Sequence, residues 1–228
     1  MIEGISEILD AKDVNSQKNS LSGHVFNYLR EAILSGKYQE NEELKEAAIG
    51  KEVGVSRTPV REALRQLELE GLVQIIPNKG AVVTGISLKD VKDIYEMRAL
   101  LEGLSVRKAI ANITDSMISE LEEIVELTEF YISKGKLEPI LELDNQYHET
   151  LYKAAGSKII RHTLTDFHHY LQRMRKTTLN DIDRAKKSNE EHIAILNAIK
   201  EHNADEGEKL ANAHIKSSIR NIENHGLW

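Results

Sequence analysis

Apolar residues recur every three or four positions along most of the chain, the spacing that places them on one face of an α-helix. In the first part of the chain this pattern predicts three helices, over residues 21–35, 44–53 and 56–70. Short apolar runs at 72–76 and 81–84 flank a polar loop at 77–80 and predict a β-hairpin. Residues 20–85 are therefore expected to form a helical domain with one small hairpin.

After residue 85 the helical spacing continues without a convincing strand. We predict six helices there, over residues 87–111, 115–134, 136–155, 157–177, 183–202 and 205–224. Helices of this kind, joined by short polar breaks, pack as antiparallel bundles. The chain is thus expected to be mostly α, with an N-terminal extension over residues 1–19 and an all-α antiparallel helical bundle over residues 86–228.

The second and third predicted helices meet at a glycine. Gly54 suits the left-handed turn that ends a helix, Ser56 is placed to cap the next helix, and Pro59 lies in its first turn. Two helices joined by a short glycine turn form a helix-turn-helix, whose second helix enters the major groove of DNA with its N-terminal residues leading. With the hairpin as a wing, residues 20–85 are predicted to be a winged helix-turn-helix.

The leading end of the second motif helix carries hydrogen-bond donors that suit DNA. Arg57 and Arg61 present planar groups that fit guanine edges or phosphates, and the hydroxyls of Ser56 and Thr58 fit phosphates. The alternative is an ordinary amphipathic helix with a solvated arginine face, because short helix-turn-helix patterns have many false positives.

The segment GVSRTPVREAL, followed by EGLV and a wing that ends in glycine, resembles the GntR family of bacterial transcription factors. The resemblance implies a winged helix-turn-helix that binds double-stranded operator DNA, with Lys79 and Gly80 of the wing at the interface. Ala47 stands where several family members carry a DNA-contacting arginine, which makes Lys79 more important here.

The helical half is similar to the FCD branch of that family. The similarity lies in the segments IYEMRALLEGLSVRKA, DNQYHETLYKAAGS, EEHIAILNAI and NAHIK, so that it extends over nearly the whole chain. It implies a domain that binds an effector and holds a homodimer together.

Four ligand-type side chains fall on helix faces that are expected to point inward. Asp144 and His148 are four positions apart, and His192 precedes His214 by 22 residues. If the chain turns near Asn203, two antiparallel helices carry the two later histidines at the same height. Three imidazoles and one carboxylate form an ordinary ligand set for a divalent metal ion, zinc or nickel first of all, and the FCD resemblance implies such a site. For each residue alone, a hydrogen-bonded core histidine or an Asp–His pair is the alternative.

Other charged and histidine residues are expected to have smaller roles. Arg98 lies in the mostly apolar segment MRALLEGL, and the FCD resemblance places it near a small organic acid effector, whose carboxylate it would bind. The alternative for Arg98 is a surface pair with Glu102, four residues later. At most one of His168 and His169 can face inward and line the pocket, and surface exposure is expected for them. Surface exposure is also expected for His162, His202 and His225.

The net charge of −7 argues against a protein coated in basic residues. Residues 20–87 hold eight Lys and Arg against nine Asp and Glu, so the DNA-binding domain is basic on one face only, and two copies in a homodimer on a palindromic operator would strengthen binding. The absence of cysteine excludes disulfides and thiolate metal sites. No apolar run is long enough for a membrane span, so a cytoplasmic protein is expected.

These features together predict a ligand-responsive transcriptional regulator, most simply a repressor, and not an enzyme. Two alternatives share the same residues: a metal-sensing repressor that answers to the ion itself, and a metalloenzyme built in a helical bundle. The enzyme is disfavoured because neither the Glu-x-x-His pairs of di-iron bundles nor a His-Asp dipeptide occurs in the sequence.

Overall fold

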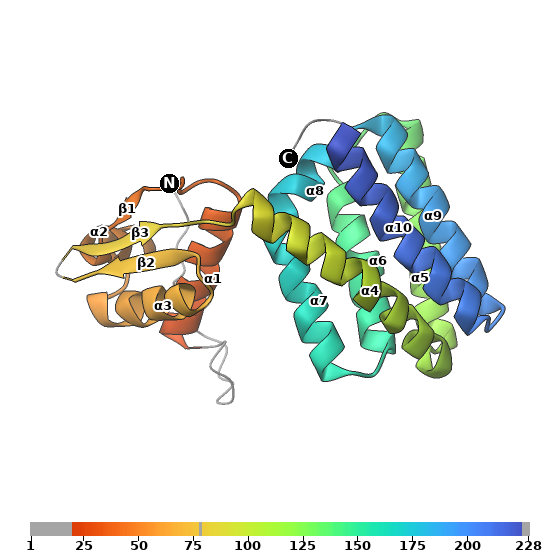
Figure 1. The fold of residues 1–228 in the computed structure, drawn as a ribbon, viewed down its shortest axis with the longest axis horizontal. Helices are drawn as coiled ribbons and strands as arrows, with labels where there is room; N and C mark the ends of the chain where they lie inside the picture. Colours follow the sequence, from red (N-terminus) through yellow and green to blue (C-terminus); the bar gives the residue numbers. More distant parts are fainter. Residues whose placement is uncertain (1–19, 78, 225–228) are drawn as a thin grey trace. The chain divides into compact units, whose positions relative to one another are not determined.

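The computed structural model describes residues 20–77 and 79–224, so the predicted extension at 1–19 and His225 lie outside the described residues. The chain divides into two compact units, the first ending at Ser87 and the second beginning at Leu88 (Figure 1). Within the described part, no helix is long and apolar enough to cross a bilayer.

The first unit is a winged helix-turn-helix. Its described residues form the helices α1 (Leu21–Leu34), α2 (Glu46–Val53) and α3 (Arg57–Leu69) and the strands β1 (Glu43–Leu44), β2 (Val73–Ile76) and β3 (Gly80–Val83). Helix α1 packs along α3, and Val25, Leu29, Leu64 and Leu67 are buried in the core between the elements. The strands form an antiparallel sheet in the order β1-β3-β2, in which the β2–β3 hairpin is the predicted wing.

Strand β1 was not predicted, and the predicted start of a helix at residue 44 is wrong. Glu43 pairs with Val82 and Leu44 with Ala81, and the helix begins two residues later, at Glu46. Leu44 has the apolar character that suggested a helix, but its side chain is buried from a strand. The spacing of apolar residues within one segment does not show that the segment pairs with a distant strand.

The turn of the motif has the expected glycine. Gly54 ends α2 with φ of 78°, a left-handed conformation that a residue with a Cβ adopts at a cost, and α3 follows from Arg57. Ser56 occupies the N-cap position in an extended conformation, but its side chain makes no capping hydrogen bond. The predicted side-chain cap is therefore wrong, although the helix starts where a cap would place it.

The second unit is an all-α antiparallel bundle, as predicted. Its described residues form α4 (Leu88–Asn112), α5 (Asp115–Ser133), α6 (Ile140–Ala154), α7 (Lys158–Tyr170), α8 (Gln172–Leu179), α9 (Ile182–Lys200) and α10 (Ala204–Asn224). The single helix predicted over residues 157–177 is two helices, because the chain leaves helical geometry at Leu171 (φ −92°, ψ 1°) and buries that side chain fully.

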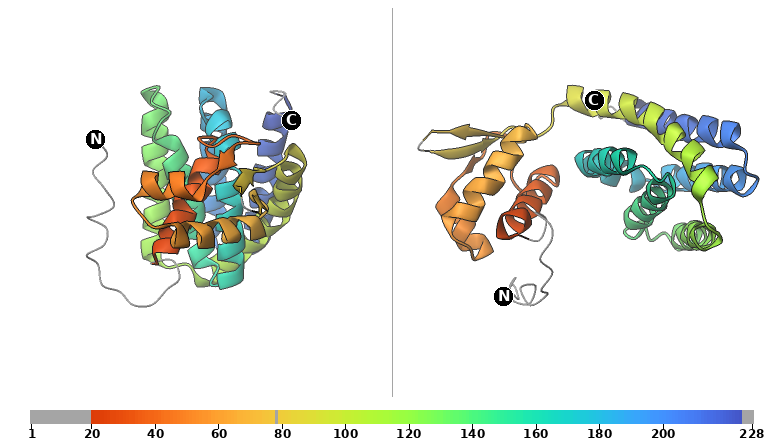
Figure 2. Two further views of the ribbon diagram at one scale, coloured as in Figure 1. Left: turned by 90° about the vertical axis from the view of Figure 1, so that its left-hand side faces the viewer. Right: turned by 90° about the horizontal axis from the view of Figure 1, so that it is seen from below.

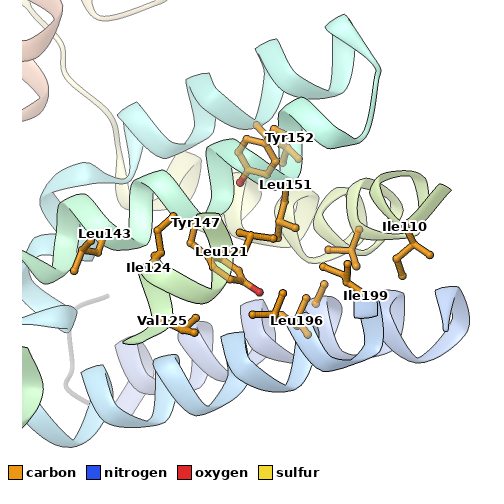
Figure 3. Packing of buried hydrophobic residues seen from close by; sticks show 14 of the residues in the cluster. Ile110, Leu121, Ile124, Val125, Leu143, Tyr147, Leu151, Tyr152, Leu196 and Ile199 are labelled. Carbon is orange, nitrogen blue, oxygen red and sulfur yellow. The ribbon is translucent and has the colours of Figure 1, made fainter. Parts of the chain in front are cut away.

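The helices of this unit surround one hydrophobic core. Helix α10 runs alongside α4 and also packs on α9, and α5 packs against α6 and α9 (Figures 1 and 2). Leu121 from α5, Tyr147 and Leu151 from α6, and Leu196 and Ile199 from α9 meet in this core (Figure 3). This packing sets the inner faces of α4, α6, α9 and α10, and with them the polar residues that those faces carry.

Candidate functional site

A groove in the first unit runs between α2, the exposed face of α3 and the wing. Four of the predicted DNA-binding residues line it, namely Arg57, Arg61, Lys79 and Gly80, and they are joined by Lys45, Ala47 and Arg65. Ser56 and Thr58 lie exposed at the start of α3 and are not part of the lining. The structure thus brings positive side chains from three elements to one concave surface, which is the footprint that DNA recognition requires.

The arginines of this groove are held differently. Arg61 donates from Nε and Nη2 to the two carboxylate oxygens of Glu46, both at 2.7 Å, which leaves Nη1 outside the pair. This fork-to-fork contact fixes the direction of the Arg61 side chain. Arg57 is exposed and forms no hydrogen bond or ion pair within the described residues. The Arg61 side chain is therefore oriented before DNA binds, whereas the Arg57 side chain is free to move toward a phosphate or a base.

Gly80 has a structural role that is independent of DNA. Its φ is 110°, and a Cβ at this position would collide with the carbonyl oxygen of Leu44 in β1. Glycine is therefore required where β1 approaches β3, whatever the wing contacts.

In the second unit three histidines converge from α6, α9 and α10. The ring centroids of His192 and His214 lie 4.7 Å apart, and those of His148 lie 5.2 Å and 5.5 Å from them. One ring nitrogen from each histidine lies within 4.8 Å of the others, and all three side chains are buried. The α9–α10 turn places His192 and His214 side by side at the same height along the two helices.

Asp144 lies one helical turn before His148, at the edge of the cluster. Its Oδ1 is 3.7 Å from Nε2 of His192, and its Oδ2 accepts a hydrogen bond from Arg175. Burial alone would raise the pKa of Asp144, but the nearby positive charge, that of Arg175 first, outweighs burial and holds the pKa below its ordinary value. The carboxylate is therefore ionised, and it is shared between Arg175 and the histidines.

The donor set fits a divalent metal ion. Nε2 of His192 is buried and has no hydrogen-bond partner within the described residues, an arrangement that is costly without a ligand, whereas Nδ1 of His148 faces Glu102 Oε2 at 3.4 Å. Burial lowers the pKa of His192 and of His214, so both rings are neutral near pH 7 and offer the lone pairs that metal binding needs. Tyr147 stacks on the His192 ring at 4.1 Å and donates from its hydroxyl to the His192 carbonyl, which holds that ring in place.

Arg98 forms the pair with Glu102 that the sequence suggested, but the pair is buried instead of lying on the surface. Nη2 of Arg98 lies 2.7 Å from Glu102 Oε1 and 2.7 Å from His168 Nε2, and the hydroxyl of Tyr152 lies 2.6 Å and 2.7 Å from the same two atoms. Glu102, His148 and His168 have a spacing that would also suit a metal. In that group, however, the Arg98 guanidinium already contacts Glu102 and His168, so it supplies the positive charge that a metal ion would otherwise bring.

The expected exposure of His168 is wrong, whereas His169 and His162 are exposed as predicted. His168 follows the fully buried Leu164 by four residues, so it shares the inner face of α7 and meets Arg98 there. The four-residue spacing from Leu164 is the sequence feature that could have predicted the burial of His168.

A small cavity of about 20 Å³ is lined by His148 and His214 of the cluster and by three arginines, Arg98, Arg175 and Arg184. A space of this size holds about one water molecule. Sequence reasoning identified Arg98 and missed the other two. Arg175 was detectable, because it lies four residues from Leu171 and Leu179 on an apolar face, where a charge needs a partner.

Known proteins match both units. A family model described as bacterial regulatory proteins, gntR family, matches residues 21–83, and one described as FCD domain matches residues 93–217. The HTH-type transcriptional repressor RspR of Escherichia coli is 27% identical over 201 residues, 87% of this chain and 88% of the repressor. The uncharacterized HTH-type transcriptional regulator YdhC of Bacillus subtilis is 28% identical over 199 residues, 87% of this chain and 89% of that protein.

Solved structures share the fold. Escherichia coli McbR/YncC superposes with a TM-score of 0.73 at 20% identity, covering 90% of this chain and 98% of that chain. A putative transcriptional regulator GntR from Rhodococcus sp. RHA1 gives 0.65 at 20% identity, with 89% and 97% covered. At these identities the likeness extends to the arrangement of helices and wing and to nothing finer.

Proposed function

This chain belongs to the GntR family of bacterial regulatory proteins, with an FCD domain as its helical unit, and from this premise we propose that it is a ligand-responsive repressor. It is a DNA-binding transcriptional regulator, and its named relatives are regulators and repressors, which sets aside the metalloenzyme alternative. The proposal adds a divalent metal, a small carboxylate effector and a homodimer on a palindromic operator.

The observation that carries the proposal is the buried donor cluster. His148, His192, His214 and Asp144 come from three helices of one bundle, and the buried Nε2 of His192 has no hydrogen-bond partner within the described residues. If this part of the core had only a structural role, apolar side chains or fully hydrogen-bonded polar groups would be expected at these positions. A zinc or nickel ion would take the histidine nitrogens and the Asp144 carboxylate, and it would leave positions open for an effector oxygen.

The three arginines support an anionic effector. Arg98, Arg175 and Arg184 reach the cavity next to His148 and His214, and guanidinium groups bind carboxylates through paired hydrogen bonds. The cavity admits an organic acid only after these side chains move, because its present volume of about 20 Å³ holds little more than a water molecule.

The small volume also favours a second candidate, a repressor that senses the metal itself. Such a protein needs the donor cluster and no room for an organic acid. The two candidates differ in one respect: in the first, carboxylates change operator binding at constant metal, and in the second they do not.

The test begins with metal analysis of protein purified without chelator, for wild type, His192→Ala and His214→Ala, with the exposed His169→Ala as the matched control. We expect metal in wild type and in the control and loss of metal in both cluster variants. Full occupancy in both cluster variants would contradict the assignment. Operator binding is then titrated with zinc or nickel alone and with added carboxylates, which separates the two candidates.

The proposed homodimer has a candidate surface on α4. On the outward face of this helix Met97, Leu100 and Leu104 are exposed at spacings of three and four, Leu100 by 73%. A contiguous row of exposed apolar side chains marks a candidate protein–protein interface. Light scattering of Leu100→Glu should show a monomer where wild type is a dimer, whereas Phe130→Glu on α5, also an exposed apolar position, should remain dimeric. A monomeric wild type would refute the dimer.

A further inference from the structure

We propose that Glu191 is a positioning residue of the metal site: it orients His214 toward the ion, and it is shared with Arg184, which faces the anion cavity. The inference rests on the metal site proposed above. It assigns to the chain a carboxylate that sets metal affinity and a route by which an anion changes that affinity.

Glu191 lies beside the cluster without belonging to the donor set. It precedes His192 on α9, and its Oε2 is 2.8 Å from Nδ1 of the buried His214 on α10. A carboxylate accepts hydrogen bonds, so this contact places the proton on Nδ1 and leaves the lone pair on Nε2. A carboxylate behind a ligating histidine fixes the ring and raises its basicity as a ligand.

The same carboxylate oxygen has a second donor. Nη1 and Nη2 of Arg184 both lie 3.3 Å from Glu191 Oε2, and these nitrogens also donate to Ser217 at 3.2 Å and Ser218 at 3.0 Å. Arg184 therefore competes with His214 for one oxygen atom, at a longer distance. The serines hold the Arg184 guanidinium within one turn of His214.

Arg184 also lines the cavity, together with His148, Asp144 and Arg175. An anion in the cavity would attract the Arg184 guanidinium away from Glu191. Glu191 would then lose a positive partner, and its negative charge would act more strongly on His214 and make that ring a stronger donor to the metal. Anion and metal are thereby coupled through one shared carboxylate, and by linkage each raises the affinity for the other.

Zinc titrations of the full chain against a chromophoric competitor test the first step. We expect Glu191→Gln to weaken zinc binding on the order of 10- to 100-fold, and Glu191→Ala at least as much. The exposed neighbour Glu190→Gln should bind as wild type does. Arg184→Gln removes the other member of the same ion pair but should not weaken zinc binding, because it relieves the competition for Oε2 and removes a nearby positive charge.

The opposite response of the two members of one ion pair distinguishes positioning from loss of structure, since loss of structure would weaken zinc binding in both. Equal zinc affinity in wild type and Glu191→Gln, or equal loss in Glu191→Gln and Arg184→Gln, would overturn the inference while leaving the metal site standing. Failure of wild type to bind zinc would overturn the metal site as well, so the two failures are distinguishable.

Two further measurements complete the test. The tautomer of His214, read from nitrogen chemical shifts of the metal-free protein, should be the Nδ1-protonated form in wild type and should lose that preference in Glu191→Ala. Acetate, used as the carboxylate probe, should raise zinc affinity in wild type and have a smaller effect in Arg184→Gln. An Nε2-protonated wild type would contradict the orientation of His214, and equal effects of acetate would contradict the coupling.

Discussion

Each unit of the chain places an Arg–Glu ion pair at its site, and the two pairs lie in opposite surroundings. The side chains of Arg61 and Glu46, in the DNA-binding groove, are 53% and 22% exposed, whereas those of Arg98 and Glu102, in the bundle, are each 3% exposed. Water weakens the attraction in the first pair and keeps both charges solvated when they separate. In the second pair neither charge can be left alone without a large desolvation cost.

This difference matches what the two units do. A DNA-binding face must exchange its internal contacts for contacts with phosphates and bases, so Arg61 needs a partner that it can release. A ligand site must keep its geometry in the absence of the ligand, and Arg98 is held by Glu102 and His168 at once. Opening the Arg61–Glu46 pair and not the Arg98–Glu102 pair is therefore the expected behaviour.

The largest effect is expected from Glu102→Ala. It leaves Arg98 buried without its carboxylate, and breaking a buried ion pair on one side costs about 3–5 kcal/mol in the free energy of unfolding. Denaturant unfolding of the metal-free protein measures this cost, with the exposed Glu96→Ala on the same helix as the control. A loss below about 1 kcal/mol would show that Arg98 finds water or another partner when Glu102 is absent.

The next effect is expected in operator binding. Arg57→Ala and Arg61→Ala should each cost about 1–3 kcal/mol if the side chain reads a base, and each should relax specificity at one position of the operator. Gel-shift titrations measure the affinity. Lys51→Ala, at an exposed position of α2 outside the groove lining, removes the same charge and should change little. If both arginine variants bound as tightly as wild type, α3 would not be the recognition helix.

Glu46→Gln should have a smaller effect on folding, below about 1 kcal/mol in the free energy of unfolding, because the pair with Arg61 is solvent-exposed. Measured beside Glu102→Ala under the same conditions, it gives the comparison between the two pairs directly. A cost equal to that of Glu102→Ala would mean that the groove pair is structural and not releasable.

The smallest effect concerns Glu52 in the first unit. Hydrogen bonds from Lys37, Tyr28 and Tyr38 lower the pKa of this exposed carboxyl from 4.5 to about 2. Because the folded-state pKa is depressed, the stabilisation is present above pH 4.5 and is lost as the pH falls toward 2. The difference in melting temperature between wild type and Glu52→Gln should therefore shrink over that interval, with exposed Glu40→Gln as the control. A difference that stays constant with pH would show that these hydrogen bonds do not hold the ionised form.

Prediction from the sequence succeeded where neighbours in the chain are also neighbours in space. Helical spacing identified the helices of both units, and Gly54 marked the turn of the motif. His192 and His214 could be set opposite each other because α9 and α10 are consecutive and joined by a short turn. The family resemblance, confirmed by the family models, added the types of the two domains.

Prediction from the sequence failed where contacts join segments that are far apart in the chain. Strand β1 exists because Leu44 pairs with Ala81, and the break at Leu171 exists because that side chain is needed in the core. His168 is buried because α7 packs against α4 and α6, which bring Arg98 and Tyr152 to its ring.

By itself the sequence determined most of the helical elements, the winged motif and the inward faces that carry Asp144, His148, His192 and His214, because each of these follows from spacing along one stretch of chain. Only the tertiary structure decided which polar residues meet: Asp144 with Arg175, Glu191 with both His214 and Arg184, and Arg98 with Glu102 in the interior. The physical reason is that helical spacing shows which residues share a face, whereas the partner of that face is set by packing among all the helices at once.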